Sequence, residues 1–280
     1  MEKPIIRKEN IETLMESRFI KVFDLQYAPG KHYYDASRRP LDNLVAHKSD
    51  EEFKSMLPDA VSCFVILKIA NDAPRLLTSY EYRYPAGQFL LSPPAGLIDP
   101  EDAQLVTAAD QFLLSPPAGL IDPEDAQLAS VPAQETSAGS DSDNADAESS
   151  QSASDANCTS KSTQRPQDAA ILSAAAREIH EETGLVVKET DRIFVVNPLL
   201  FSSPGMTDES NALACAVISV EDTSALSQTG AVGSELFAGF KLLSKEEACE
   251  ILKRGCDEHG NYFSVYTWCA LMYFVSGMWE

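Results

Sequence analysis

Positive charge is scarce in this sequence. Its 280 residues include 22 Lys and Arg against 43 Asp and Glu, which gives a formal net charge of −21. Such an acidic chain is expected to repel nucleic-acid backbones and anionic membranes, so neither is an expected partner. The charge does not exclude an anionic substrate, because a bound metal ion inverts the local sign.

Paired cysteines and long apolar runs are also missing. None of the six cysteines forms a Cys-x-x-Cys pair. This usage indicates reduced thiols in a cytoplasmic protein and argues against a disulfide framework or a zinc site. The start, Met-Glu-Lys-Pro, is not expected to begin a signal peptide. The longest apolar run, residues 265–278, is too short and too mixed to span a bilayer.

Residues 1–57 are expected to form a small β-rich unit. Residues 19–27 have the composition of a strand, Pro29-Gly30 predicts a turn, and residues 32–35 fit a returning strand. Ser-Asp-Glu-Glu at 49–52 predicts a capped short helix.

Residues 58–280 are expected to form the main domain. The run at 61–68 is almost continuously apolar, which is typical of a buried central strand. Further strands are predicted at 75–84, 186–187, 193–196, 211–220 and 237–243, and helices at 169–183, 245–254 and 264–279. The last helix is expected to bury Trp268, Met272 and Phe274 in the core.

The helix at 169–183 has clear signals at both ends. It opens with an Ala-rich run of strong helix formers, and Asp168 is the expected N-cap. Gly184 is expected to end the helix in the left-handed conformation.

One segment of the main domain occurs twice. Residues 88–105 recur unchanged as residues 111–128. A solenoid needs about three or more units, so we interpret this repeat as a local tandem duplication. Only one copy can occupy a given strand, and the first is favoured because it continues directly from the strand at 75–84.

The segment after the second copy, residues 129–167, is of low complexity and contains no aromatic residue and no Leu, Ile or Met. It cannot bury enough apolar surface to offset its ordering entropy, so we expect a disordered surface loop. Doubling the length of a loop adds only about 0.6 kcal/mol to its closure. The fold can therefore accommodate residues 106–167 as an insertion.

The most informative stretch is Arg-Glu-Ile-His-Glu-Glu-Thr-Gly-Leu at 177–185. Glu178, Glu181 and Glu182 share one face of the expected helix, where like charges repel by roughly 0.2–0.5 kcal/mol per pair. They also lie at the C-terminal end, where the helix dipole disfavours negative charge. A solvated acidic helix end is the alternative interpretation. We favour a site for a hard cation such as Mg²⁺, which prefers clustered oxygen ligands.

This stretch resembles the second half of the Nudix hydrolase box, Arg-Glu-aliphatic-any-Glu-Glu-any-Gly-aliphatic, and meets every fixed position. The first half of the box needs a Gly and a Glu at set distances before the Arg, where this sequence has Thr163 and Ala169. The glycine turn of the family is matched further upstream by Gly96, or by Gly119 in the second copy.

The resemblance implies a fold and an interruption of the box. The implied fold is a Nudix-type α/β/α sandwich with a mixed sheet over residues 58–280, preceded by the small N-terminal β unit. The implied interruption is a long insertion, residues 106–167, inside the box.

Three further segments resemble the ADP-ribose pyrophosphatase branch of that family, at 81–87, 93–99 and 203–209. The resemblance implies that Arg83 helps to hold the substrate and that Pro204 and Gly205 belong to a substrate-binding loop. In that branch an N-terminal β segment builds a homodimer, which is the expected assembly here.

The resemblance also implies the reaction. It is hydrolysis of the pyrophosphate bond in a nucleoside diphosphate linked to another group, most closely ADP-ribose to AMP and ribose 5-phosphate, with Mg²⁺ as cofactor and Mn²⁺ as a substitute. The implied metal ligands are Glu178, Glu181, Glu182 and the backbone carbonyl of Ala95, or of Ala118 if the second copy is the functional one.

Other residues receive roles from the same resemblance. Arg177 would orient Glu178 or Glu181. The catalytic base would be Glu182 or an acid on a later loop, for which Glu235 is the candidate. The Glu of the box that pairs with the Arg would be replaced by Asp102 or Asp125.

Three alternatives stay open at this point. The substrate could be another nucleotide sugar or a dinucleoside polyphosphate. The chain could be a nucleotide-binding module without turnover. The duplication and insertion could also have broken the geometry of the box and left a folded, inactive protein.

Overall fold

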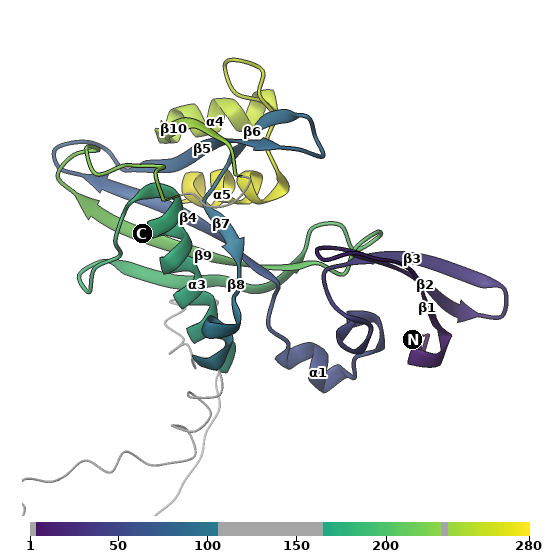
Figure 1. Cartoon of the computed structure of the whole chain (residues 1–280). Coiled ribbons are helices and arrows are strands. Elements are labelled where there is room, and N and C mark those ends of the chain that lie inside the picture. The colour runs from purple at the N-terminus through teal and green to yellow at the C-terminus, as the bar shows by residue number, and fades with distance from the viewer. Residues whose placement is uncertain (1–3, 106–164, 231–234) are drawn as a thin grey trace, which may run out of the picture. The chain divides into compact units, whose positions relative to one another are not determined.

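The computed structural model describes residues 4–105, 165–230 and 235–280 (Figure 1). The second copy of the repeat, which carries Ala118, Gly119 and Asp125, lies outside the described residues, and so does the low-complexity segment up to residue 164. The described residues belong to one compact unit. A domain boundary at residue 57 stays a prediction.

The N-terminal unit contains a three-stranded antiparallel sheet in the order β1-β2-β3, made of β1 (Ile11–Glu16), β2 (Lys21–Ala28) and β3 (Lys31–Ser37). The sequence predicts β2 and β3 but not β1. The turn between β2 and β3 needs the positive φ of 67° that Gly30 adopts.

Short helical elements flank this sheet. They are η1 (Lys8–Asn10), η2 (Leu41–Asn43), η3 (Val45–His47) and α1 (Asp50–Ser55). The predicted cap of α1 is confirmed, because Ser49 and Glu52 form a reciprocal capping box.

A seven-stranded mixed sheet forms the centre of the main domain, with the strand order β10-β5-β4-β9-β8. Its strands are β4 (Ala60–Ile69), β5 (Arg75–Arg83), β6 (Gln88–Ser92), β7 (Ala95–Leu97), β8 (Arg192–Phe201), β9 (Ser210–Val220) and β10 (Phe237–Leu243). Strand β4 pairs in parallel with β9 and antiparallel with β5 and β7, and β6 extends the sheet beside β5.

Helices cover both faces of this sheet. Helix α3 (Pro166–Thr183) lies on one face, and α4 (Lys245–Arg254) and α5 (Val265–Ser276) lie on the other (Figure 1). Successive residues of a strand point to opposite faces. Accordingly, Val65 packs in the core beneath α3 while Phe64 packs in the core beneath α4 and α5. The predicted α/β/α sandwich with a mixed sheet is confirmed.

Helix α3 begins slightly earlier than expected. Its N-cap is Arg165, and Pro166 occupies the first turn, where a missing N–H has no cost. The prediction of Asp168 as N-cap was wrong. Asp168 lies inside the first turn and accepts a hydrogen bond from the Arg165 backbone N–H at 3.1 Å. The expected disorder therefore does not extend to residues 166–167, which are helical.

Three other expectations need correction. Residues 186–187 do not form a strand, and β8 begins at Arg192 and continues to Phe201, so the following loop starts later than expected. Trp268 and Met272 are exposed, whereas Phe274 is buried.

No helix among residues 4–105, 165–230 and 235–280 is long and apolar enough to cross a membrane.

Candidate functional site

The glycine turn of the first repeat copy lies directly against the acidic helix. Strand β7 pairs with the start of β4, with Gly96 opposite Val61. A Cβ built on Gly96 would lie only 1.9 Å from Cδ of Glu178 and 2.0 Å from its Oε1. The carboxylate of Glu178 therefore packs against the backbone at Gly96, and no larger residue fits there without displacing it.

The neighbouring residue of β7 contacts another acid of α3. The backbone N–H of Ala95 donates to Oε1 of Glu182 at 3.4 Å. Glu178 and Glu182 are both buried and lie one helical turn apart. The first repeat copy thus lies against the acidic face of α3, which brings Ala95, Gly96, Glu178 and Glu182 together.

Arg177 supplies positive charge to this site. Its Nη1 lies 2.7 Å from Oε1 of Glu178 and 3.5 Å from Oε2 of Glu181. Glu181 is partly exposed, while Glu178 is buried. Arg177 therefore orients Glu178 through a short charged hydrogen bond and attracts Glu181 more weakly.

The second nitrogen of the Arg177 guanidinium binds the segment that follows β7. Nη2 donates to the carbonyl oxygen of Leu97 at 2.8 Å and to Oδ2 of Asp102 at 3.2 Å, and it lies 3.3 Å from Oδ2 of Asp99. Asp102 is buried and also accepts from the Ser173 hydroxyl at 2.7 Å. Asp102, one of the two aspartates left open by the sequence, thus pairs with Arg177, and Asp125 lies outside the described residues.

Burial makes this cluster of acids electrostatically costly. It raises the pKa of Glu182 to about 9, with a further contribution from the negative charge of Glu81. Burial also raises the pKa of Glu178 to about 7, although Arg177 opposes the shift. Both carboxylates would carry their charge more readily beside an additional cation.

Two residues of β5 extend the site. Glu81 is buried, and its carboxylate lies 2.6 Å from the Arg83 guanidinium, whose side chain is 45% exposed. Burial raises the pKa of Glu81, and Arg83 lowers it. The negative charge of Glu235 raises the pKa of Glu81, Glu178 and Glu182, which places Glu235 within electrostatic range of the acidic face.

The donor set at this site suits a hard cation. Carboxylate oxygens of Glu178 and Glu182 lie beside the backbone of Gly96 and Ala95, and Glu181 lies on the same face of α3. Oxygen donors of this kind are those that Mg²⁺ prefers. In the described part of the chain, however, no three Asp, Glu, His or Cys side chains are already arranged around one metal position. Arg177 engages Glu178, and Glu182 faces an N–H, so side-chain rotation would be needed.

The end of α3 is fixed by a glycine cap and by a later loop. Gly184 has φ 74°, and its N–H donates to the His180 carbonyl at 2.8 Å, as the sequence predicts. Ser227 N–H donates to the Thr183 carbonyl at 2.9 Å. A Cβ on Gly230 would lie 2.5 Å from the Glu181 carbonyl oxygen, so this loop packs closely on the last turn.

The predicted substrate loop contacts the N-terminal sheet. The Tyr33 hydroxyl donates to the Gly205 carbonyl at 2.9 Å, and Pro204 lines a cavity beside β3. Arg38 forms an ion pair with Glu209 at 2.7 Å. These contacts place Pro204 and Gly205 at the junction with the N-terminal unit and do not connect them to the acidic face of α3.

Sequence reasoning did not assign a role to Glu81 or to the loop at 225–230. Glu81 is two residues before Arg83 and therefore lies on the same face of β5. This spacing was the sequence signal from which their pairing could have been predicted. The close packing of Gly230 on Glu181 has no local sequence signature, because it depends on the tertiary fold.

No family model matches this chain, and no curated protein does. Among solved structures, the crystal structure of an ADP compounds hydrolase is 15% identical, with 100% of this chain and 95% of that chain covered and a TM-score of 0.44. The binary complex of a C. elegans Ap4A hydrolase is 14% identical, with 78% and 97% covered and a TM-score of 0.34. Both TM-scores lie below 0.5, so the function of this chain is argued from its own site.

Proposed function

We propose that this chain hydrolyses the pyrophosphate bond of a nucleoside diphosphate linked to another group, in a reaction that depends on Mg²⁺. The favoured substrate is ADP-ribose, which would give AMP and ribose 5-phosphate. The observation that carries the proposal is the contact of Gly96 with Glu178, in a site where several carboxylates share the guanidinium of Arg177.

The charge balance of the site supports a cation. Arg177 is the guanidinium shared by Glu178, Glu181, Asp99 and Asp102. A single positive charge cannot balance four carboxylates, two of which are buried. A divalent cation would offset this excess and would attract the diphosphate of a substrate.

Each residue has a role in this proposal. Glu178, Glu181 and Glu182 would hold Mg²⁺ together with the Ala95 carbonyl, and Arg177 would keep Glu178 in place. When bound, Mg²⁺ polarises phosphate oxygens and lowers the pKa of a bound water. The proton of the attacking water would pass to Glu182 or to Glu235, both of which are carboxylates of this cluster.

Arg83 is the proposed substrate clamp. Its guanidinium is half exposed and is held by Glu81 at the edge of the acidic cluster. A substrate phosphate could accept hydrogen bonds from the exposed nitrogens while Glu81 keeps the side chain oriented. Lysine would lose the fork of donors, so Arg83 suits an anionic substrate better than a point charge would.

The N-terminal sheet favours a homodimer. Leu14, Met15, Phe19, Ile20 and Tyr34 are exposed apolar side chains on or beside its strands. Clusters of exposed apolar side chains are typical of interaction surfaces. We propose that a second copy of the chain covers them, which sedimentation of the full chain would test. The cytoplasmic location stays a prediction from the cysteine usage.

Release of AMP from ADP-ribose by the full chain, with and without Mg²⁺, tests the proposed reaction. Glu182→Gln should lower kcat by about 100-fold or more, because it removes one proposed metal ligand and one proposed base. Glu189→Gln is the matched control, since Glu189 is an exposed acid outside the cluster, and it should retain full activity. Equal activity of the wild type and Glu182→Gln would refute the ligand assignment.

A substrate panel separates the alternatives. Faster turnover of a nucleotide sugar or a dinucleoside polyphosphate than of ADP-ribose would keep the reaction class and change the substrate. Tight binding of ADP-ribose with Mg²⁺ but without AMP release would identify a nucleotide-binding module. Weak Mg²⁺ binding by the wild type, without AMP release, would show that the insertion has broken the site.

A further inference from the structure

The cavity that Pro204 lines has a volume of about 290 Å³ and lies where strand β3 meets η3, α1 and the loop after β8. Its walls are largely aromatic and aliphatic, and they include Tyr33, Val45, Phe53 and Phe201. The Phe53 and Phe201 rings are stacked with their centroids 6.0 Å apart. The cavity therefore offers a flat apolar surface of the kind that holds small organic ligands.

Two acids line this apolar cavity, Asp35 from β3 and Asp208 from the loop before β9. Their side chains are almost wholly buried, with 6% of Asp35 and 8% of Asp208 exposed. The backbone N–H of Asp208 is near enough to Asp35 to lower its pKa against the effect of burial. Oδ2 of Asp208 accepts a hydrogen bond from the Val45 backbone N–H at 3.2 Å. The other oxygens, Oδ2 of Asp35 and Oδ1 of Asp208, have no hydrogen-bond partner among the described residues.

The nearby positive charge is insufficient for these acids. Nε of Arg39 lies 3.9 Å from Oδ2 of Asp208, but its Nη2 donates to Asp59 at 2.7 Å and to the Ser210 hydroxyl at 3.1 Å. The Arg39 guanidinium therefore pairs closely with Asp59 and only weakly with Asp208. A buried carboxylate without a full partner is costly unless a ligand supplies one.

We propose that this cavity binds a small organic amine whose cationic head lies between Asp35 and Asp208 and whose flat apolar body packs on Phe53 and Phe201. An ammonium or amidinium head supplies a positive charge and several N–H donors. The two unpartnered oxygens are buried, so the carboxylates of Asp35 and Asp208 would turn toward the cavity to accept these hydrogen bonds. A bare metal ion would use the carboxylates but not the aromatic walls. This site is separate from the acidic face of α3 and does not depend on the proposed hydrolysis.

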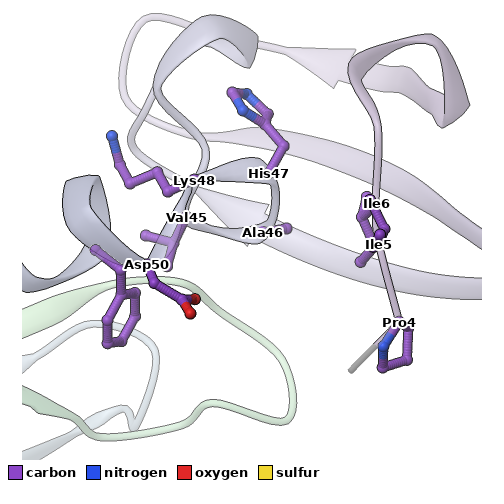
Figure 2. Close-up of a pocket in the computed structure, with 9 residues that line it drawn as sticks. Pro4, Ile5, Ile6, Val45, Ala46, His47, Lys48 and Asp50 are labelled. Carbon is purple, nitrogen blue, oxygen red and sulfur yellow. The ribbon is translucent and has the colours of Figure 1, made fainter. Parts of the chain in front are cut away.

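A neighbouring hollow of about 340 Å³ is another place near this sheet where a small ligand could bind, and its charges differ from those of the cavity. It shares Val45, Ala46 and Phe53 with the cavity. The rest of its wall comes from residues 4–6, His47, Lys48 and Asp50 (Figure 2). His47 and Lys48 lie on that wall, as Figure 2 shows. Asp50 lies on the same wall, so the hollow carries charges of both signs. Among the residues that the structure describes, the cavity is lined by Asp35 and Asp208 and by no Lys, Arg or His, so a cation should select the cavity.

The first test compares two probes on the full wild-type chain by isothermal titration calorimetry. Benzylamine carries the ring and the cationic head, and benzyl alcohol carries the same ring with a neutral head. We expect benzylamine to bind roughly tenfold or more tightly than benzyl alcohol, because charge-assisted hydrogen bonds are the stronger ones. Equal affinity of the two probes, or no measurable binding of benzylamine, would overturn the proposal.

The second test uses isosteric variants. Asp35→Asn and Asp208→Asn should each weaken benzylamine binding by roughly tenfold or more while leaving weak benzyl alcohol binding unchanged. Asp24→Asn is the matched control, because Asp24 is also buried in the same sheet but pairs with His32 at 2.7 Å and does not line the cavity. An equal loss in Asp24→Asn and Asp208→Asn would contradict the assignment.

One further measurement separates this site from the proposed active site. Glu182→Gln should abolish AMP release and leave benzylamine affinity unchanged. Loss of benzylamine binding in Glu182→Gln would show that the probe binds at α3, and the proposal would then be wrong. Failure of ADP-ribose hydrolysis in the wild type would leave the amine site unaffected.

Discussion

Replacing Gly96 by alanine is the sharpest perturbation of the proposed active site. The new Cβ would lie 1.9 Å from Cδ of Glu178 and 2.0 and 2.2 Å from its two oxygens. Carbon atoms in favourable contact lie about 3.5–4.0 Å apart. The carboxylate of Glu178, or the β7 backbone, must therefore move by about 1.5–2 Å.

The size of the effect follows from what holds Glu178. Its end can rotate, but Arg177 binds it at 2.7 Å and the surrounding residues bury it. Overpacking of a buried position costs about 1–3 kcal/mol of stability. A displacement of about 1 Å in a positioned catalytic group can reduce the rate about 100-fold, so we expect Gly96→Ala to lower kcat/KM for ADP-ribose by at least that factor.

Two control variants make the result specific. Gly119→Ala makes the same change in the second repeat copy and should leave kcat/KM unchanged if the first copy alone contacts α3. Gly255→Ala places an alanine at the end of α4, where φ is 80° and no atom lies within 4 Å of the new Cβ. It should cost about 1–2 kcal/mol of stability through backbone strain and leave the activity of the folded protein unchanged.

The assay is AMP release from ADP-ribose with Mg²⁺ at a temperature where circular dichroism shows every variant folded. Full activity in Gly96→Ala would refute the contact between Gly96 and Glu178 as a requirement of the site. Loss of activity in Gly119→Ala with none in Gly96→Ala would assign the site to the second copy.

Three further predictions concern stability. Asp102→Asn should lower the free energy of unfolding in urea by about 1–3 kcal/mol, because the charged partner of Arg177 is lost while the hydrogen bond to Ser173 can remain; no change would mean that this ion pair is not structural. Mg²⁺ at about 100 times its Kd should raise the wild-type free energy of unfolding by about 2.7 kcal/mol, and a similar rise in Glu182→Gln would place the ion elsewhere. Burial and the charge of Asp208 raise the pKa of Asp35 from 3.8 to about 6, so the folded state binds this proton more tightly than the unfolded state and stability falls as pH rises from about 4 to 6. Asp35→Asn should therefore stabilise the protein at pH 7 by up to roughly 3 kcal/mol and have little effect near pH 3; a destabilised variant at pH 7 would contradict this.

Local patterns in the sequence predicted the central elements well. β4 is almost continuously apolar because both of its faces are covered. The C-cap of α3 and the capping box of α1 depend on residues within one turn, so Gly184, Ser49 and Glu52 could be interpreted without the fold. The three acids of α3 share a face for the same local reason.

Elements whose residues face solvent or bend irregularly were harder to predict. β1 was missed because nearly all of its side chains are exposed, so it lacks the alternation of a half-buried strand. Val186 and Val187 suggested a strand by composition, yet Val186 is exposed in an irregular passage after the Gly184 cap. Trp268 and Met272 lie on the solvent side of α5, which is apolar nearly all round and so gives no sign of its buried face.

The candidate site combines predictable and unpredictable parts. Glu178, Glu181 and Glu182 follow from their spacing, but the choice between Asp102 and Asp125 could not be made from the sequence, because the two repeat copies are identical. Only tertiary structure distinguishes identical segments, and it pairs Asp102 with Arg177. The amine cavity was not visible in the sequence either, because Asp35 and Asp208 are far apart along the chain.

The contacts around Arg177 also explain how the site can tolerate a long interruption. Residues 105 and 165 flank the segment outside the described residues. Hydrogen bonds near these two residues join the chain before the segment to the chain after it. Arg177 bonds the Leu97 carbonyl, and Ser173 bonds Asp102, across 80 and 71 residues of sequence. The entropic cost of closing such a loop grows by only about 0.6 kcal/mol for each doubling of its length, whereas a single charged hydrogen bond contributes about 1.5–3 kcal/mol. The length of the insertion is therefore a weak constraint on the site, and the identities of Gly96, Asp102 and Arg177 are strong ones.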